Sequence, residues 1–191
     1  MERLPGKAAL LIIDAQEGFL PAVFEAPAAM RGIERLLTAA RKAKLPVIFT
    51  QEMHRKEGVD FGRELDGSEG VHCLEGTEDV EIAAALRPLD GEYRVVKRRY
   101  SCFFATDLDL LLRGLNVQTL IVCGFLTDVC VHYTCVDAHQ HDYYVRVAVD
   151  AVSGSTPEAH EASLRAIQYL QSAAPTNADE IEALLGAAIG R

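Results

Sequence analysis

Five short apolar runs, separated by segments of helical spacing, most strongly constrain how this 191-residue chain can fold. Each run is continuous and partly β-branched, which is typical of strands buried on both faces of a parallel sheet. The five runs are Ala8–Ile13, Pro46–Gln51, Tyr93–Val96, Thr119–Cys123 and Tyr144–Val149. A short sixth strand is expected near Ala173–Ala174.

The segments between these runs predict helices. The signals are apolar spacing, a glycine that ends a helix, a proline in the first turn and a capping box. The expected helices are Ala28–Lys44, Thr106–Arg113, Thr127–His139, Glu158–Leu170 and Asn177–Leu185. Strands that alternate with helices imply βαβ units with right-handed crossovers. We therefore expect one α/β domain over residues 1–191. It should be a Rossmann-like, three-layer αβα fold around a mostly parallel six-stranded sheet.

Composition narrows the classes of function. The net charge of −9 opposes nucleic-acid binding and suits a small neutral or cationic substrate. No uncharged apolar stretch reaches the ~18 residues of a membrane span, and the N-terminus does not resemble a signal peptide. The five cysteines are widely spread and form no C-x-x-C pair, which argues against a disulfide scaffold. We expect a cytoplasmic protein that acts on a small molecule, without membrane or nucleic-acid partners.

Polar residues at strand ends are the candidates for chemistry, because open α/β sheets bind ligands beyond the carboxyl ends of their strands. Asp14 ends the first run and Lys97 ends the third. Cys130 follows the fourth, in the first turn of a predicted helix that Thr127 or Asp128 would cap. The helix N-terminus and a nearby Lys97 would lower the pKa of the Cys130 thiol.

Each of these residues also has a purely structural interpretation. Cys130 could pack as a small hydrophobe, as we expect for Cys123 and Cys135. Lys97 could belong to a surface charge cluster, and Asp14 could cap a strand end. A carboxylate, an ammonium and a thiol at one sheet edge are more specific together than singly. The long polar segment from His54 to Thr77 would be functional, as long loops in compact domains usually are.

Three motifs resemble those of the isochorismatase-like cysteine hydrolases. They are Asp14-Ala15-Gln16, then Lys97 with Ser101 and Phe103, then Gly124, Thr127, Cys130 and Val131. The resemblance implies the fold of that family and a catalytic triad of Asp14, Lys97 and Cys130. It also implies a cis peptide at Phe125–Leu126 and an oxyanion hole formed by the backbone N–H groups of Leu126 and Cys130. Many relatives have a smaller residue at position 126, which implies a narrower pocket here.

A cysteine nucleophile points to the amidase branch of this family. The resemblance then implies hydrolysis of a small amide, ureido or carbamoyl compound through a thioester, as in N-carbamoylsarcosine amidase and the biuret and ureidoacrylate hydrolases. The expected pocket wall comprises Phe19, Arg98, Tyr100 and Phe125. Arg98 or Arg99 could pair with a substrate carboxylate or could remain a surface charge.

Two alternatives stay open. The first is a nicotinamidase with zinc, iron or manganese held by Glu52, His54 and His72. Here Glu52 replaces the family's aspartate, and Glu69 stands where nicotinamidases often carry a tryptophan, so no cofactor is required in the favoured interpretation. The second is a catalytically silent family member that acts as a binding or assembly protein. Relatives are usually oligomeric, so a homodimer or homotetramer is expected.

Overall fold

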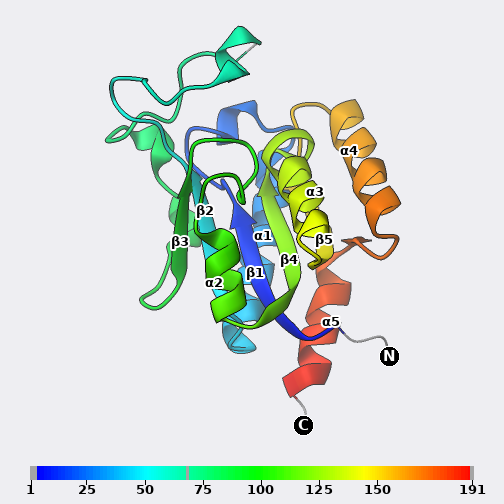
Figure 1. Ribbon diagram of the computed structural model, residues 1–191. Coiled ribbons are helices and arrows are strands. Elements are labelled where there is room, and N and C mark those ends of the chain that lie inside the picture. The colour runs from blue at the N-terminus through cyan, green and yellow to red at the C-terminus, as the bar shows by residue number, and fades with distance from the viewer. Residues whose placement is uncertain (1–3, 68, 190–191) are drawn as a thin grey trace.

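A six-stranded, fully parallel sheet forms the centre of the computed structural model, which describes residues 4–67 and 69–189 (Figure 1). The sheet order is β3-β2-β1-β4-β5-β6. The strands are β1 (Lys7–Ile13), β2 (Val47–Glu52), β3 (Tyr93–Lys97), β4 (Val117–Phe125), β5 (Tyr144–Ser153) and β6 (Pro175–Thr176). The predicted α/β class and the parallel sheet are confirmed, and the sixth strand lies two residues further along the chain than expected.

Helices cover both faces of the sheet (Figure 1). On one face pack α1 (Ala26–Lys42) and α5 (Ala178–Ile189). On the other face pack α2 (Leu108–Gly114), α3 (His132–Gln140) and α4 (Pro157–Leu170). The chain builds β1, β2 and β3 toward one edge and β4, β5 and β6 toward the other. The order therefore reverses between β1 and β4, the place where such sheets open a binding crevice.

The two central strands explain the strongest apolar run of the sequence. Leu10 and Ile12 pack toward α1, whereas Leu11 and Ile13 pack toward α2 and α3. Because both faces are buried, the run is continuous instead of alternating. At the carboxyl end Ile13 lies beside Gly124, where an added Cβ would stand 2.0 Å from the Ile13 carbonyl oxygen. Only glycine allows this approach, which brings the ends of β1 and β4 together.

The predicted helix at 127–139 differs from the observed structure. Residues Thr127–Val131 form a π-helical turn, and the α-helix begins only at His132. Leu126 occupies the N-cap position, and no side chain caps the turn. The expected caps bond elsewhere, because Thr127 pairs with His160 and Asp128 pairs with Ser155. A π-turn is wider than an α-turn and occurs often at functional sites.

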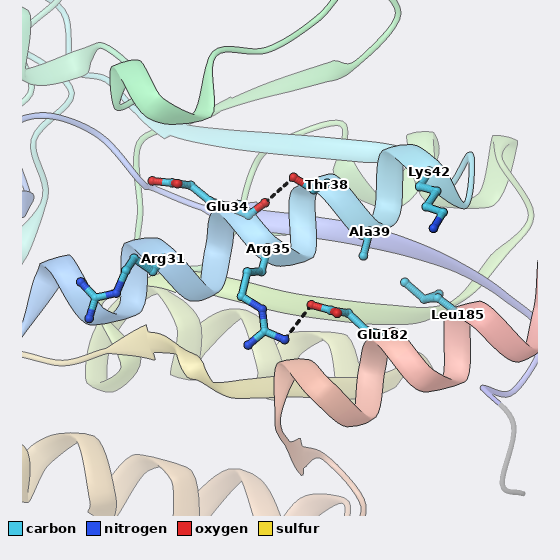
Figure 2. Close-up of a pocket in the computed structure, with 9 residues that line it drawn as sticks. Arg31, Glu34, Arg35, Thr38, Ala39, Lys42, Glu182 and Leu185 are labelled. Atoms are coloured by element: carbon cyan, nitrogen blue, oxygen red, sulfur yellow. Dashed lines mark hydrogen bonds and ion pairs between the residues drawn. The ribbon is translucent and has the colours of Figure 1, made fainter.

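Helix α5 confirms its predicted cap and packs against α1. The backbone N–H of Glu180 donates to Oδ1 of Asn177 over 2.9 Å. Figure 2 shows the hollow between the two helices, bridged where Arg35 of α1 pairs with Glu182 of α5 at 3.0 Å. No helix in the described part of the chain has the length and apolar character needed to cross a bilayer.

The polar segment between β2 and β3 contains three short 3-10 turns, at Arg63–Asp66, Glu78–Val80 and Ala84–Leu86. It projects beyond the carboxyl edge of the sheet (Figure 1). One isolated bridge joins it to the chain after β1, where Gln16 pairs with Ile82, and a second bridge, between His54 and Leu74, lies within the segment. The segment therefore contributes side chains to the edge where the strand-end residues gather.

Candidate active site

Asp14, Lys97 and Cys130 converge on one point at the carboxyl edge of the sheet. The Lys97 ammonium nitrogen lies 2.7 Å from Oδ2 of Asp14 and 3.3 Å from Sγ of Cys130. All three side chains are buried. Lys97 extends from β3, Asp14 directly follows β1, and Cys130 lies on the turn after β4. The structure thus brings together the carboxylate, the ammonium and the thiol that the sequence placed at separate strand ends.

Asp14 is held in an unusual backbone conformation by Thr50 of β2. Its φ is 45°, in the left-handed region, and its backbone N–H donates to the Thr50 hydroxyl over 3.1 Å. The same hydroxyl donates to Oδ1 of Asp14 over 2.7 Å. The other oxygen, Oδ2, forms the ion pair with Lys97 but receives no well-aligned hydrogen bond. A carboxylate oxygen of Asp14 also lies within 4.8 Å of the Cys130 sulfur.

Glu52 belongs to the same cluster, which the sequence did not reveal. Its Oε2 accepts a hydrogen bond from Lys97 over 2.6 Å and lies 3.7 Å from the Cys130 sulfur. Its Oε1 lies 2.9 Å from Nε2 of His72. Gln16, from the first motif, fixes the end of β2: it accepts from the Glu52 N–H and donates to the Glu52 carbonyl oxygen. The pairing of β2 with β3 is the feature that would have predicted this contact, because Glu52 and Lys97 are paired positions on the two strands.

Burial and charge act in opposite directions on the two carboxyl groups. Burial raises the pKa of Asp14, and the Lys97 ammonium offsets this only in part. Burial also acts to raise the pKa of Glu52, but Lys97, His54 and His72 together hold that pKa well below its usual range. Glu52 is therefore the permanent anion of the pair, and Asp14 is the carboxylate that more readily takes up a proton.

The ionisation of Cys130 differs from the prediction. Burial raises the pKa of its thiol well above the usual value, and Asp14 and Glu52 raise it further, while Lys97 lowers it. The expected lowering fails because burial of the thiol outweighs the attraction of the one ammonium, which is also shared between two carboxylates. The Lys97 pKa stays well above its usual value despite burial, owing to Asp14, Cys130 and Glu52. The resting cluster therefore holds a charged ammonium and a neutral thiol.

Cys130 faces a narrow cavity of about 20 Å³, which has room for little more than a water molecule. Phe19, Tyr100 and Phe125 line this cavity, as predicted. Arg98 does not, because it donates from Nε to Oδ2 of Asp60 over 2.8 Å instead. The expected place of Arg98 in the pocket wall is therefore wrong: the acidic loop residue draws its guanidinium away from the nucleophile.

The turn beneath the nucleophile begins with one backbone feature that the resemblance implied. The Phe125–Leu126 peptide bond is cis. The Leu126 carbonyl oxygen accepts from the N–H groups of Val129 and Val131, each over 3.1 Å. Leu126 also lines the cavity beside Cys130. Cys123 and Cys135 lie in the apolar core as predicted, and burial raises the pKa of both thiols.

Comparison with known proteins decides the family. The model of the isochorismatase domain matches residues 8–180. The chain belongs to the isochorismatase family. A probable inactive nicotinamidase from Arabidopsis thaliana is 32% identical over 179 residues, which cover 88% of this chain and 91% of that protein. The ureidoacrylate amidohydrolase RutB from Pseudomonas syringae is 30% identical over 187 residues, which cover 84% of this chain and 76% of that protein.

Solved structures agree with this assignment. An isochorismatase family protein from Desulfovibrio vulgaris superposes with a TM-score of 0.84 at 31% identity, and the match covers 95% of this chain and 99% of that one. This isochorismatase-family protein therefore resembles other members of the family in fold as well as in sequence, and its relatives include an amidohydrolase.

A second cluster of this isochorismatase-family protein has the donor set of a metal site. The candidate ligand atoms of Glu52, His54 and His72 lie within 4.8 Å of one another. Nδ1 of His54 is buried without a hydrogen-bond partner and lies 3.6 Å from Oδ1 of Asp60. One carboxylate and two imidazoles suit zinc, iron or manganese, so the residue types fit. However, Glu52 raises the pKa of His72 to about 9, so a cation would have to displace a proton.

A much larger hollow lies elsewhere on this isochorismatase-family protein. It measures about 880 Å³ and lies between α1 and α5, where Arg31, Arg35, Lys42 and Glu182 line it (Figure 2). It holds no cysteine and no buried acid–base pair. The size of a hollow therefore does not identify the candidate active site of this molecule, whereas the convergence of Asp14, Lys97 and Cys130 does.

Proposed function

We propose that this protein is an amidohydrolase that cleaves a small amide, ureido or carbamoyl C–N bond through a thioester on Cys130. The observation that carries the proposal is the position of one buried ammonium, 2.7 Å from the Asp14 carboxylate and 3.3 Å from the Cys130 sulfur. The relatives include an amidohydrolase, and the family is one of hydrolases.

The first step transfers the Cys130 proton to Oδ2 of Asp14. Burial has raised the pKa of Asp14, which makes this carboxylate a stronger base than an exposed one. The negative charge moves from carboxylate to sulfur while the Lys97 ammonium contacts both atoms, so no buried charge is left unpaired. The thiolate then attacks the carbonyl carbon of the substrate.

The tetrahedral oxyanion needs donors, which we assign to the backbone N–H groups of Leu126 and Cys130. Such donors contribute ~3–4 kcal/mol each in comparable hydrolases. Protonated Asp14 gives its proton to the leaving nitrogen, the C–N bond breaks, and ammonia or an amine departs from the thioester. Asp14 then takes a proton from water, the hydroxide attacks the thioester, and the sulfur leaves with that proton as a thiol.

Glu52 has a separate role in this scheme. It stays ionised, because Lys97 and the two histidines hold its pKa well below the usual range despite burial. Its short contact with the Lys97 ammonium, 2.6 Å, holds that group between Asp14 and Cys130. Glu52 is therefore a positioning residue, whereas Asp14 exchanges the proton.

A nicotinamidase with a divalent metal is the second candidate, favoured by the convergence of Glu52, His54 and His72. Such an ion would supply a Lewis acid near the substrate. The third candidate is a catalytically silent binding or assembly protein. Its support is the 32% identity to a probable inactive nicotinamidase.

An ammonia-release screen tests these candidates. The panel contains nicotinamide, biuret, N-carbamoyl amino acids and ureidoacrylate, each with and without a chelator. We expect turnover of at least one compound by the wild type and none by Cys130→Ala, while Cys123→Ala, which changes a core cysteine, keeps activity. Full activity of Cys130→Ala would refute covalent catalysis. Loss of activity with chelator would support the metal-dependent candidate, and a wild type that is inactive throughout would favour the silent one.

A further inference from the structure

The cavity at Cys130 contains a second carboxylate that the proposed mechanism does not use. Glu69 lines the cavity together with Tyr100. The Tyr100 hydroxyl donates to Oε2 of Glu69 over 3.1 Å. Among residues 4–67 and 69–189, no side chain or backbone group donates to the other oxygen, Oε1. Glu69 thus offers a free acceptor to whatever enters the cavity.

The cations near this cavity are already occupied. Lys97 pairs with Asp14 and Glu52, at 2.7 and 2.6 Å. His72 directs one ring nitrogen to Glu52 and the other to the carbonyl oxygen of Gly70, over 2.7 Å. In the described part of the chain no lysine or arginine lies within ion-pair distance of Glu69.

The two arginines expected to bind a substrate carboxylate point to the same loop residue. Arg98 donates to the Asp60 carboxylate, and Arg99 donates to the Asp60 carbonyl oxygen, each over 2.8 Å. Neither lines the cavity. A substrate beside Cys130 therefore meets the carboxylate wall formed by Glu69, and the one cation among the described lining residues, His72, is already paired with Glu52. A narrow, partly desolvated cavity strengthens the interaction of that wall with a charged substrate.

We propose that Glu69 is a specificity-determining residue that selects neutral N–H-rich or cationic amides and rejects substrates bearing a carboxylate near the scissile bond. The inference rests on the proposed function and narrows its substrate class. Biuret and amino-substituted amides meet the requirement, since they offer N–H donors or a positive charge to Oε1. N-carbamoyl amino acids and ureidoacrylate do not, since each would place an anion near Glu69.

Alkylation of Cys130 tests this selectivity without requiring turnover. Iodoacetamide and iodoacetate have nearly the same shape and differ in charge. After dialysis against chelator at pH 8.5, the labelling rate at Cys130 is measured by peptide mass spectrometry for the wild type and Glu69→Gln. We expect Glu69→Gln to raise the iodoacetate-to-iodoacetamide rate ratio about tenfold, the effect of removing one nearby charge. The matched control is Glu57→Gln, which loses the same charge from an exposed position outside the cavity.

Tyr100→Phe separates charge from hydrogen bonding. It removes the donor to Glu69 but keeps the carboxylate, so the rate ratio should stay at the wild-type value or fall. Tyr100→Phe is also the variant to measure if circular dichroism shows that Glu69→Gln folds poorly. An unchanged ratio in a folded Glu69→Gln overturns the proposal, as does a Glu57→Gln change of equal size. A Cys130 that neither reagent labels in any variant overturns the accessible pocket on which the proposal depends.

A turnover measurement keeps this inference distinct from the proposed function. Glycinamide, propanamide and malonamate are small amides with a positive, neutral and negative substituent. We expect kcat/KM to fall in that order for the wild type, and the spread to shrink about tenfold in Glu69→Gln. If no amide is hydrolysed but the alkylation ratio depends on Glu69, the amidohydrolase proposal fails and the selectivity stands. If amides are hydrolysed without any dependence on Glu69, the selectivity proposal fails and the amidohydrolase proposal stands.

Discussion

At the scale of single residues, Lys97 holds the site together. Its ammonium lies within 3.3 Å of Asp14, Glu52 and Cys130, and its side chain is buried. Two buried carboxylates can share this small volume only because a cation lies between them. Lys97 thus links the strand ends β1, β2 and β3 to the turn after β4. Its loss should affect folding as well as catalysis.

Lys97→Met should lower the free energy of unfolding by about 3–5 kcal/mol, the usual cost of leaving a buried charge unpaired. Urea denaturation at pH 7 measures the change. Adding Glu52→Gln to Lys97→Met should recover part of the stability, because it removes one of the two stranded anions, but no amide turnover. A Lys97→Met protein as stable as the wild type would contradict the buried ion cluster.

Asp14→Asn should separate the reactivity of Cys130 from catalysis. The Asp14 carboxylate is one of the groups that raise the pKa of the Cys130 thiol. Removing its negative charge favours the thiolate, so that pKa should fall and iodoacetamide should label Cys130 at a lower pH than in the wild type. Turnover should nevertheless be lost, because the proton acceptor is gone. Asparagine tolerates the left-handed φ of 45° and can still accept from Thr50.

The measurement is the pH dependence of Cys130 alkylation, followed by mass spectrometry, with Cys123 as an internal control that is buried in the core. A labelling profile that stays in place, or moves to higher pH, would show that Asp14 does not act on the thiol. Retained turnover in Asp14→Asn would assign the general base to another group.

At the scale of elements, the turn carrying Cys130 is clamped by the start of α4. Asp128 accepts from the backbone N–H of Ser155 over 2.9 Å and from its hydroxyl over 2.6 Å. The Thr127 hydroxyl lies 2.9 Å from Nδ1 of His160. A side chain at Gly154 would collide with Asp128, since an added Cβ would lie 2.4 Å from its Oδ1. These contacts fix the turn from outside the cavity.

Asp128→Ala should therefore loosen the nucleophile without removing any reacting group. We expect a loss of about 1–2 kcal/mol in unfolding free energy, from two broken hydrogen bonds. The value of kcat should fall about tenfold or more because the sulfur is less well placed, while KM changes little. Steady-state kinetics and urea denaturation measure both effects. The control Glu161→Ala removes an exposed carboxylate from α4, which does not contact the turn through that side chain. Equal effects of the two substitutions would argue against the clamp.

The strands and the start of α5 could be predicted from the sequence, because each leaves a local pattern in it. Strands buried on both faces leave continuous apolar runs, and Asn177 with Glu180 marks the start of α5. The π-turn was not readable, because Thr127 and Asp128 look like ordinary caps until their partners on α4 are known. Local propensity was overridden there by a tertiary contact.

The candidate site was predictable in its strand-end residues but not in its electrostatics. Asp14, Lys97 and Cys130 stand out because each ends or follows an apolar run. The role of Glu52 depends on side-chain reach between neighbouring strands, which residue spacing does not reveal. The prediction gave a lowered pKa for the Cys130 thiol because it left out burial, the largest cause of the raised pKa, and this second carboxylate. Likewise, Arg98 lies within the second motif, yet Asp60 draws it away from the cavity.

At the scale of the whole molecule, the groups that could react and a contact that stabilises the fold lie at different parts of the sheet. The strand order reverses between β1 and β4, and the reacting groups gather at the carboxyl edge on both sides of that point. Farther from this edge, Arg41 of α1 holds Glu92, just before β3, with two hydrogen bonds of 2.7 and 2.9 Å. This pair joins a covering helix to an edge strand of the sheet and takes no part in the site.

The Arg41–Glu92 pair predicts how stability changes with acid. Hydrogen bonding to Arg41 holds the pKa of the Glu92 carboxyl below its ordinary value. A lowered folded-state pKa stabilises the fold above the unfolded-state pKa, and this contribution is lost as the pH falls through the folded-state pKa. Glu92→Gln should therefore cost about 1 kcal/mol at pH 7, since the pair is bidentate but partly exposed, and almost nothing in strong acid. Urea denaturation of both proteins between pH 7 and pH 3 gives this difference, and a cost that grows on acidification would contradict the assignment, because protonating Glu92 can only weaken its bond to the guanidinium.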